Sequence, residues 1–250
     1  MPSSAVKSPD SDSEKYITYN EIPREIVELH GAWLQSEHDR LKVMFEAEKE
    51  VLNSGVRFIA GVDEVGRGPL AGSVVACAVV FDGFRFLPGL NDSKKIKEDL
   101  REILFDEIYK CAHVSTGHAD PGEIDRINIH SAALLAMRRA IEGLPIKPGM
   151  IFVDGRFTVP GIDCPQQPVI KGDGKVLSIA AASVIAKVTR DRRMYEYDKE
   201  YPGYSFSSHK GYCTKKHVDA VMKLGPCPIH RKSFEPIKSM DSPGEQLSFI

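Results

Sequence analysis

The sequence predicts an α/β protein in which helices cover a central sheet. Short apolar runs come first after residue 55, and helical patterns then alternate with further short apolar runs. This order of elements is typical of a sheet layered by helices. The chain has 250 residues, of which 42% are hydrophobic. A sizeable core is therefore expected, and a wholly disordered chain is excluded.

The composition also indicates where the protein is located and what its cysteines do. No run approaches the roughly 18 consecutive apolar residues of a membrane helix, and the first residues lack the apolar segment of a signal peptide. The cysteines are odd in number, scattered and without a CxxC pair, which predicts free thiols and neither disulfides nor a zinc site. We expect a soluble protein of the cytoplasm with no membrane partner.

The first 55 residues predict an acidic N-terminal extension. Residues 1–14 are rich in Ser, Asp and Pro and are expected to be disordered. From Trp33 onward, apolar residues recur at steps of three, four and seven, which predicts an amphipathic helix that ends near residues 53–55. Residues 1–55 contain six Lys or Arg against eleven Asp or Glu.

The rest of the chain divides into a core, a basic region and a tail. We predict an α/β core over residues 56–200, a basic region over 201–238 and a loose tail over 239–250. In the core, apolar runs predict strands at 58–62, 73–81, 113–118, 150–153 and 168–170. Helical periodicity predicts helices at about 95–111, 129–142 and 177–199.

The C-terminal third is the basic end of the protein. Residues 207–239 contain seven Lys or Arg against two acidic residues. A basic surface that meets phosphates and a merely solvated face both fit this charge asymmetry.

Three strand-like runs each stop at acidic residues. The run at 58–62 is followed by Asp63 and Glu64, the run at 150–153 by Asp154, and the run at 168–170 by Asp173 shortly after. Groups just beyond strand ends gather at one edge of an α/β sheet, although each acid alone is also typical of a turn or a helix cap. Clustered carboxylates need a neutralising cation, and oxygen ligands favour Mg²⁺ or Mn²⁺ over zinc.

A glycine-rich segment follows the first acidic pair. It reads Gly66-Arg67-Gly68, then Pro, Leu, Ala and Gly72. Glycine allows a backbone to approach a phosphate or a sugar closely, and Arg67 is suited to bidentate contact with phosphate oxygens. The alternative is a simple turn, since neither a P-loop nor a GxGxxG spacing is present.

Eight ordered motifs make the chain resemble bacterial ribonuclease HII, the type 2 ribonuclease H. The segment Gly61-Val-Asp-Glu-Val-Gly-Arg-Gly-Pro-Leu-Ala-Gly72 is similar to the signature of that family. Further matches run from about residue 57 to 238: Asn91-Asp-Ser-Lys-Lys95, Asp125 to Asn128 followed by a helix, Val153-Asp-Gly155, Lys171-Gly-Asp173, Ala182 to Asp191, His209-Lys-Gly-Tyr212 and His230-Arg-Lys-Ser-Phe234. Ser73 departs from the family, which often has proline or a bulky residue there.

The resemblance implies an RNase H-like fold with a central mixed β-sheet flanked by helices and a helical C-terminal region. It also implies that Asp63, Glu64, Asp154 and Asp173 are the catalytic, metal-binding quartet. Such an enzyme hydrolyses phosphodiesters with two Mg²⁺ or Mn²⁺ ions and leaves 5′-phosphate and 3′-hydroxyl ends. Its substrates would be RNA/DNA hybrids and duplex DNA with embedded ribonucleotides, as in ribonucleotide excision repair.

Substrate contacts follow from the same resemblance. The backbone of Gly66, Arg67 and Gly68 would approach the ribose, and Tyr212 would stack on the next sugar. The residues that fit phosphate contacts are Lys94, Lys95, Ser183, Lys187 and Lys210. Two alternatives stay open: an ion pair between Lys187 and Asp191, and a packing role for Tyr212. We assign His113, His118, His130 and His217 to solvent or core.

Two rival functions fit the motifs less well. A junction resolvase also places carboxylates at strand ends, but it gives no reason for the Gly66–Gly68 and His209–Tyr212 motifs. A non-catalytic hybrid-binding module is expected to have lost one carboxylate, and all four are present. We expect a monomer, and residues 246–250 resemble a sliding-clamp-binding peptide.

Overall fold

The structure is a computed structural model that describes the backbone of residues 24–240 and side chains from residue 31 onward. The predictions for residues 1–14 and for the clamp-binding tail therefore lie outside the described residues. A five-stranded sheet has the order β3-β2-β1-β4-β5, with β1, β2 and β3 antiparallel and β1, β4 and β5 parallel. The strands are β1 (Ile59–Val65), β2 (Val74–Phe81), β3 (Ala112–Ala119), β4 (Met150–Asp154) and β5 (Gln166–Val169).

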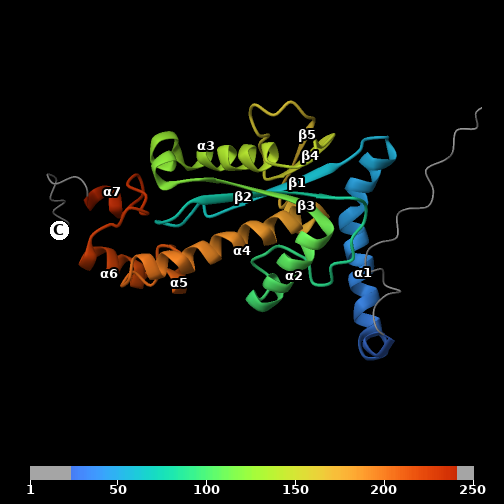
Figure 1. The fold of residues 1–250 in the computed structure, drawn as a ribbon, viewed down its shortest axis with the longest axis horizontal. Coiled ribbons are helices and arrows are strands. Elements are labelled where there is room, and N and C mark those ends of the chain that lie inside the picture. Colours follow the sequence, from blue (N-terminus) through green and yellow to red (C-terminus); the bar gives the residue numbers. More distant parts are fainter. Residues whose placement is uncertain (1–23, 241–250) are drawn as a thin grey trace, which may run out of the picture.

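Helices cover both faces of this sheet (Figure 1). One face packs against α3, and the opposite face packs against α4 and α2, while α1 crosses one end of the molecule (Figure 1). The mixed sheet flanked by helices confirms the predicted fold class. The helices are α1 (Arg24–Asn53), α2 (Glu98–Cys111), α3 (Pro121–Glu142), α4 (Leu177–Glu200), α5 (Phe206–His209), α6 (Lys215–Leu224) and α7 (Ile237–Met240).

Strand β2 shows why the central strands are continuous apolar runs. All eight of its residues are buried, because both faces of the sheet are covered. Cys77 and Val79 point into the core under α4, whereas Ala76 and Ala78 point into the core under α3. Side chains of successive strand residues alternate between faces, so one strand supplies both cores.

Helix α4 lies directly on β1 because β1 contains a glycine at the contact. A Cβ atom at Gly61 would lie 2.3 Å from the backbone nitrogen of Ile179 and 2.3 Å from the hydroxyl of Ser178. Any side chain at residue 61 would push α4 away from the sheet. This close approach places the middle of α4 beside Asp63, two residues further along β1.

Helix α3 begins earlier than periodicity predicts. Its first turn is fixed by a capping box, in which the Asp120 carboxylate accepts from the Glu123 N–H at 2.8 Å and Glu123 accepts from the Asp120 N–H at 3.1 Å. The helix is kinked at Asn128, where φ is 66°. The Asn128 side chain caps the second segment by accepting from the N–H groups of His130 and Ser131, both at 3.0 Å.

Helix α1 begins at Arg24, nine residues before the predicted start at Trp33. Its apolar side packs into the core that includes α2, α4 and the loop after β2. Two polar contacts fix that loop: Glu37 accepts from the Gly89 N–H at 2.9 Å, and Arg40 donates to the Leu90 carbonyl at 2.7 Å. The described part of the extension, from Leu34 onward, is thus packed against the core.

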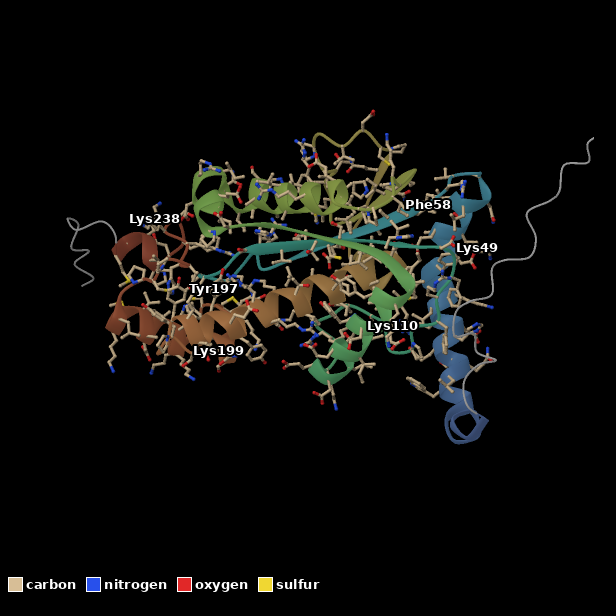
Figure 2. All side chains as sticks on the ribbon, in the orientation of Figure 1. Lys49, Phe58, Lys110, Tyr197, Lys199 and Lys238 are labelled. Carbon is tan, nitrogen blue, oxygen red and sulfur yellow. The ribbon has the colours of Figure 1, made fainter. Side chains whose placement is uncertain are left out.

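The C-terminal region packs on the far end of α4. Tyr204, Phe206, Val221 and Ile229 form one apolar cluster with residues of α4 and of the segment before β2. Figure 2 shows Lys199 and Lys238 at this end and Lys49 at the opposite end. Helix α7 continues to Met240, so the first two residues assigned to the tail are helical, and residues 241–250 lie outside the described residues. Among residues 24–240, no helix is both long and apolar enough to cross a membrane.

Candidate active site

Three of the four predicted carboxylates meet at the centre of the sheet. Asp63 and Glu64 lie within β1, and Asp154 is the last residue of the neighbouring parallel strand β4. The expectation that the first pair lies beyond its strand was wrong, since Asp63 is paired with Cys77 and Glu64 with Ala76. The expected meeting of the side chains nevertheless occurs. One ligand oxygen from each of the three residues lies within 4.8 Å of the others.

Backbone N–H groups orient two of these carboxylates. The N–H of Glu64 donates to Asp63 Oδ1 at 2.7 Å, and the N–H of Gly172 donates to Asp154 Oδ1 at 2.7 Å. Gly172 begins a short 3₁₀ helix, Gly172–Gly174, that carries the fourth carboxylate, Asp173. The bond from Gly172 therefore ties the segment of Asp173 to the end of β4.

Asp173 lies next to the trio rather than inside it. Its negative charge raises the pKa of Asp63, and the charge of Asp154 raises the pKa of Asp173 in turn. Burial is the largest cause of the raised pKa of Asp173, the carboxylate of Asp92 adds to it, and Lys94 opposes it. Asp92 and Lys94 come from the predicted Asn91–Lys95 motif, which the structure brings to the same edge.

The negative charges of the carboxylate cluster are not balanced by the positive charges of the side chains around it. Burial raises the pKa of Asp63 well above its usual range, and the charges of Glu64 and Asp154 add to the rise. Burial likewise raises the pKa of Glu64, although Arg67 at 3.1 Å opposes it. Like charges at this spacing favour a bound cation, and a donor set made only of carboxylate oxygens is typical of Mg²⁺ or Mn²⁺. The residues present therefore fit a hard divalent ion.

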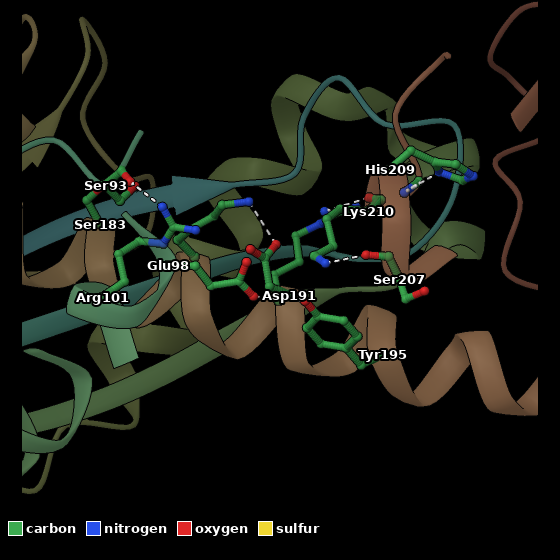
Figure 3. Close-up of polar contacts among 12 residues, drawn as sticks. Ser93, Glu98, Arg101, Ser183, Asp191, Tyr195, Ser207, His209 and Lys210 are labelled. Atoms are coloured by element: carbon green, nitrogen blue, oxygen red, sulfur yellow. Dashed lines mark hydrogen bonds and ion pairs between the residues drawn. The ribbon is translucent and has the colours of Figure 1, made fainter. Parts of the chain in front are cut away.

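Ser183 and Lys187 lie on one face of α4 beside this cluster. The Ser183 side chain is buried, its hydroxyl lies 2.9 Å from that of Ser93 (Figure 3), and its hydrogen bond to Asp63 lowers the pKa of that acid. Lys187 forms the ion pair with Asp191 that the sequence left open, at 2.8 Å. Ser183 therefore orients Asp63, whereas the charge of Lys187 is paired along the helix with Asp191.

Two buried arginines hold the segment from Gly66 to Ser73. The guanidinium of Arg231, which is fully buried, donates to the carbonyls of Gly66 at 2.5 Å, Arg67 at 2.9 Å and Gly72 at 2.8 Å. Arg190, also buried, donates to the carbonyls of Ala71, Ser73 and Lys210 at 3.0–3.1 Å. Charged donors that satisfy several carbonyls at once fix a loop more firmly than neutral ones.

The loop leaves its backbone open toward Tyr212. Gly66 has a φ of 94°, and a Cβ atom there would lie 2.3 Å from Arg190 Nε. Gly68 is exposed, and a Cβ atom there would lie 3.8 Å from Tyr212 Cε1. The Tyr212 side chain is 41% exposed, so its ring is available beside the loop. The two segments are joined by a bond of 2.8 Å from the Leu70 N–H to the Gly211 carbonyl.

A pair of buried histidines fixes the backbone of Tyr212. His217 Nδ1 lies 2.9 Å from the Tyr212 carbonyl, which only accepts, so His217 carries its proton on Nδ1. Its Nε2 then accepts from His230 Nε2, 3.0 Å away, and His230 Nδ1 accepts from the Cys227 N–H at 2.9 Å. This network assigns one tautomer to each ring. It confirms that His217 is a core residue.

Acid should destabilise the protein through this pair. Burial lowers the pKa of both His217 and His230 from 6.5 to about 4. Between these pH values the unfolded chain binds the protons and the folded chain does not, so the free energy of unfolding decreases as pH falls from about 6.5 to 4. Urea unfolding at pH 7.0, 5.5 and 4.5 tests this. A His217→Gln variant should lose less stability over that range, and an identical pH dependence would contradict the assignment.

The remaining predicted lysines lie at the rim of the site. Lys94 and Lys95 are exposed. Lys210 is half-buried, its ammonium bonds the Ser207 carbonyl and lies 3.7 Å from the ring centre of Tyr195 (Figure 3). Lys94 and Lys95 are thus available for ligands, whereas Lys210 already has partners within the protein.

Comparison with known proteins decides the family. The family model described as Ribonuclease HII matches residues 60–237, which contain the whole site. This chain belongs to the ribonuclease HII family. It is therefore a type 2 ribonuclease H, a hydrolase of phosphodiesters, and the resemblance seen in the sequence is confirmed.

Individual relatives support the same family assignment. The chain is 54% identical over 192 residues to ribonuclease HII of Citrifermentans bemidjiense, covering 76% of this chain and 83% of the relative. It is 51% identical over 191 residues to that of Caldicellulosiruptor bescii, covering 76% and 92%. The crystal structure of ribonuclease H2 from Pyrococcus horikoshii OT3 superposes with a TM-score of 0.64 at 27% identity, over 74% of this chain and 97% of that chain.

Sequence reasoning missed three residues of this ribonuclease HII site. Arg190, Arg231 and Asp92 all lie inside motifs that were recognised, yet none was singled out. For the arginines, the sequence carries no signal that separates them from the charged residues beside them, Asp191 and Lys232. For Asp92, the usable signal was an acid two residues before a pair of lysines.

Proposed function

We propose that this ribonuclease HII hydrolyses the RNA strand of RNA/DNA hybrids and cuts duplex DNA on the 5′ side of embedded ribonucleotides. The products would carry 5′-phosphate and 3′-hydroxyl ends, as the first step of ribonucleotide excision repair. The enzyme would act as a monomer in the cytoplasm. One observation carries the proposal: the carboxylate cluster, the exposed Gly68 backbone and the exposed Tyr212 ring lie in succession at one site.

The carboxylates would hold the ions of this reaction. Asp63, Glu64 and Asp154 would be the nearest ligands, and Asp173 would complete the quartet. When bound, two divalent ions would supply activation of water and neutralisation of charge at the phosphate and the leaving oxygen. Ser183 and the Gly172 N–H would keep Asp63 and Asp154 oriented, so the chain need supply no nucleophile of its own.

The glycine loop and Tyr212 would recognise the ribonucleotide. The 2′-hydroxyl is the chemical mark that separates a ribonucleotide from its DNA neighbours, and it both donates and accepts hydrogen bonds. A loop whose Gly66 and Arg67 carbonyls are already held by Arg231 presents its remaining backbone groups in a fixed place. A Cβ atom at Gly68 would already contact the Tyr212 ring at 3.8 Å, so the bare backbone and the ring would form one continuous surface for the sugar.

Three labelled duplexes test the proposal: all DNA, DNA with one ribonucleotide, and an RNA/DNA hybrid. Each is incubated with Mg²⁺, with Mn²⁺ and with neither. We expect cleavage of the second and third duplexes only, and only with metal. Product ends are checked by ligation and by phosphatase sensitivity. Cleavage of all-DNA duplex at a comparable rate, or metal-independent cleavage, would contradict it.

The basic end should supply affinity for phosphates. Lys215 and Lys216 are exposed in the first turn of α6, where the helix dipole disfavours cations and favours anions. With Ca²⁺ in place of Mg²⁺, log Kd for duplex DNA should rise linearly with log salt. The Lys215→Ala/Lys216→Ala double variant should lower that slope by about 0.9 for each phosphate contact removed.

A matched double variant at the opposite end is the control for this prediction. Lys42 and Lys49 are exposed on α1. Their replacement by alanine removes the same charge and should leave the slope unchanged. Equal slopes for all three proteins would show that the α6 lysines are only solvated.

A further inference from the structure

The Asp125–Asn128 motif has no part in the site described above, yet its first residue contacts the segment that carries Arg231. Asp125 lies in the first turns of α3 and is half-buried. Its Oδ2 accepts from the N–H of Lys232 at 2.9 Å, and its Oδ1 accepts from the N–H of Ser233 at 2.9 Å and from the hydroxyl of Ser233 at 2.6 Å. These bonds join α3 to a segment 107 residues further along the chain.

The backbone at Arg231 is fixed from its other side by the chain that precedes β2. The N–H of Arg231 donates to the Leu70 carbonyl at 2.9 Å, and the N–H of Gly72 donates to the Ile229 carbonyl at 2.8 Å. Arg231 therefore lies between two anchors. Asp125 is the anchor that comes from outside the segment that Arg231 holds.

The side chain of Arg231 connects these anchors to the Gly66–Gly68 loop. Its guanidinium donates to the carbonyls of Gly66, Arg67 and Gly72. The side chain is fully buried, and a close-packed interior transmits a shift of the backbone to the groups packed around it. A displacement of the backbone at Arg231 would therefore disturb the bonds that hold the loop.

Asp125 also supplies a negative charge for this buried cation. The guanidinium of Arg231 donates to carbonyl groups, which carry no net charge. Burial and the charge of Arg190 lower the pKa of Arg231, and the charge of Asp125 opposes this decrease. A buried charge is costly unless it is hydrogen-bonded and compensated. Asp125 thus contributes both geometry and charge to Arg231.

Helix capping does not account for Asp125. The capping acceptors of α3 are Asp120 and Asn128, and each accepts from N–H groups of α3 itself. Asp125 instead accepts from Lys232 and Ser233, which belong to the C-terminal region. Its bonds therefore serve the contact between two distant segments.

We propose that Asp125 is a positioning residue for recognition of the ribonucleotide: it holds Arg231 in place, and Arg231 holds the Gly66–Gly68 loop. Asp125 acts through Arg231 and does not contact the substrate. This inference rests on the proposed function, since it assumes that the loop recognises the ribonucleotide. It gives the Asp125–Asn128 motif a function in specificity.

Amide hydrogen exchange of the metal-free protein can follow both ends of this chain of contacts. The N–H of Phe234 donates to the Arg231 carbonyl at 3.1 Å and reports on the turn that Asp125 contacts. The N–H of Leu70 donates to the Gly211 carbonyl at 2.8 Å and reports on the chain that follows the loop. Exchange of such hydrogen-bonded groups requires local opening.

Asp125→Ala should speed exchange about 5- to 150-fold at both Phe234 and Leu70, because the two positions are coupled through Arg231. Asp120→Ala is the matched control, since it removes another acid of α3 that accepts a backbone N–H bond. It should leave exchange at both positions unchanged relative to strand β2. Unchanged exchange at Leu70 in Asp125→Ala would overturn the proposal, because Asp125 would then fix at most the turn beside it.

Binding selectivity tests the link to recognition. With Ca²⁺ in place of Mg²⁺, Kd is measured for a duplex with one ribonucleotide and for the all-DNA duplex. The ratio of the two values is insensitive to misfolding, because an unfolded fraction raises both apparent Kd values equally. Asp125→Ala should lower the wild-type preference for the ribonucleotide at least about 5-fold, whereas Asp120→Ala should keep it. Asp125→Asn keeps one acceptor oxygen and should retain more of the preference than alanine.

An unchanged preference in Asp125→Ala would also overturn the proposal. Failure of the proposed function has a different signature, in which the wild type neither prefers nor cleaves the duplex with one ribonucleotide. The exchange of Leu70 alone then decides whether Asp125 holds the loop, because that measurement needs neither substrate nor metal.

Discussion

Asp63→Asn should remove nearly all cleavage without lowering the stability of the protein. Asn keeps the size of the side chain but removes a charged ligand at the centre of the trio. We expect kcat to fall on the order of a hundredfold or more under saturating metal, as for residues that act as one catalytic unit. Asp154→Asn should have the same effect, and the double variant should have a kcat only slightly lower than that of either single variant.

Stability separates loss of function from loss of fold in this prediction. Asp63 is buried with like charges around it, which raise its pKa. A neutral Asn removes that repulsion, so the metal-free variant should unfold at the same or a higher urea concentration. Asp82→Asn changes an exposed acid just after β2 and serves as the control. A variant that retains a tenth of wild-type kcat would show that Asp63 is not an essential ligand.

Much of the sheet could be predicted from the sequence, because a strand that is buried on both faces is a continuous run of apolar residues. Strand β2 is an unbroken run of apolar residues, whereas the edge strands β3 and β5 contain polar residues. The same rule misplaced the end of β1. Asp63 and Glu64 were taken to follow the strand, but the chain stays extended through Val65 because its backbone is still paired with β2. A charged pair inside a buried strand is itself a mark of the site.

The start of α3 was missed for a different reason. Its first turns are polar and carry no clear 3.6-residue apolar period, and the helix is kinked at Asn128. The usable signal was local: Asp120, then Pro121, then Glu123, a capping box with proline at the first helical position. Capping chemistry predicts such a segment where hydrophobic periodicity does not.

The supporting residues of the site could not be predicted from spacing. Arg231 is more than 150 residues from the carbonyls it binds in the Gly66–Gly72 segment. His217 and His230 are ordinary residues of a basic region until the fold buries them behind Tyr212. Burial of a charged or titratable side chain depends on acceptors from distant segments, and a single sequence does not show that pairing.

Tyr212→Ala should lower kcat/KM for cleavage at a single embedded ribonucleotide about 10- to 100-fold. The ring is exposed next to Gly68, and the loss of one stacking contact is worth about 1–3 kcal/mol. Tyr212→Phe keeps the ring and should keep much of the activity. Binding to plain duplex DNA with Ca²⁺ should weaken far less, because phosphate contacts dominate it.

The comparison of substrates decides what Tyr212 does. If the ring reads the sugar beside the scissile step, alanine should harm cleavage at one ribonucleotide more than cleavage of a long RNA/DNA hybrid, which offers many equivalent positions. Equal losses on both substrates would mean that Tyr212 supports the site in general. An equal loss of plain-duplex binding would instead indicate that the segment around Tyr212 has collapsed. The hydrogen bond from the His217 side chain makes collapse unexpected, because it holds the Tyr212 carbonyl and does not depend on the Tyr212 ring.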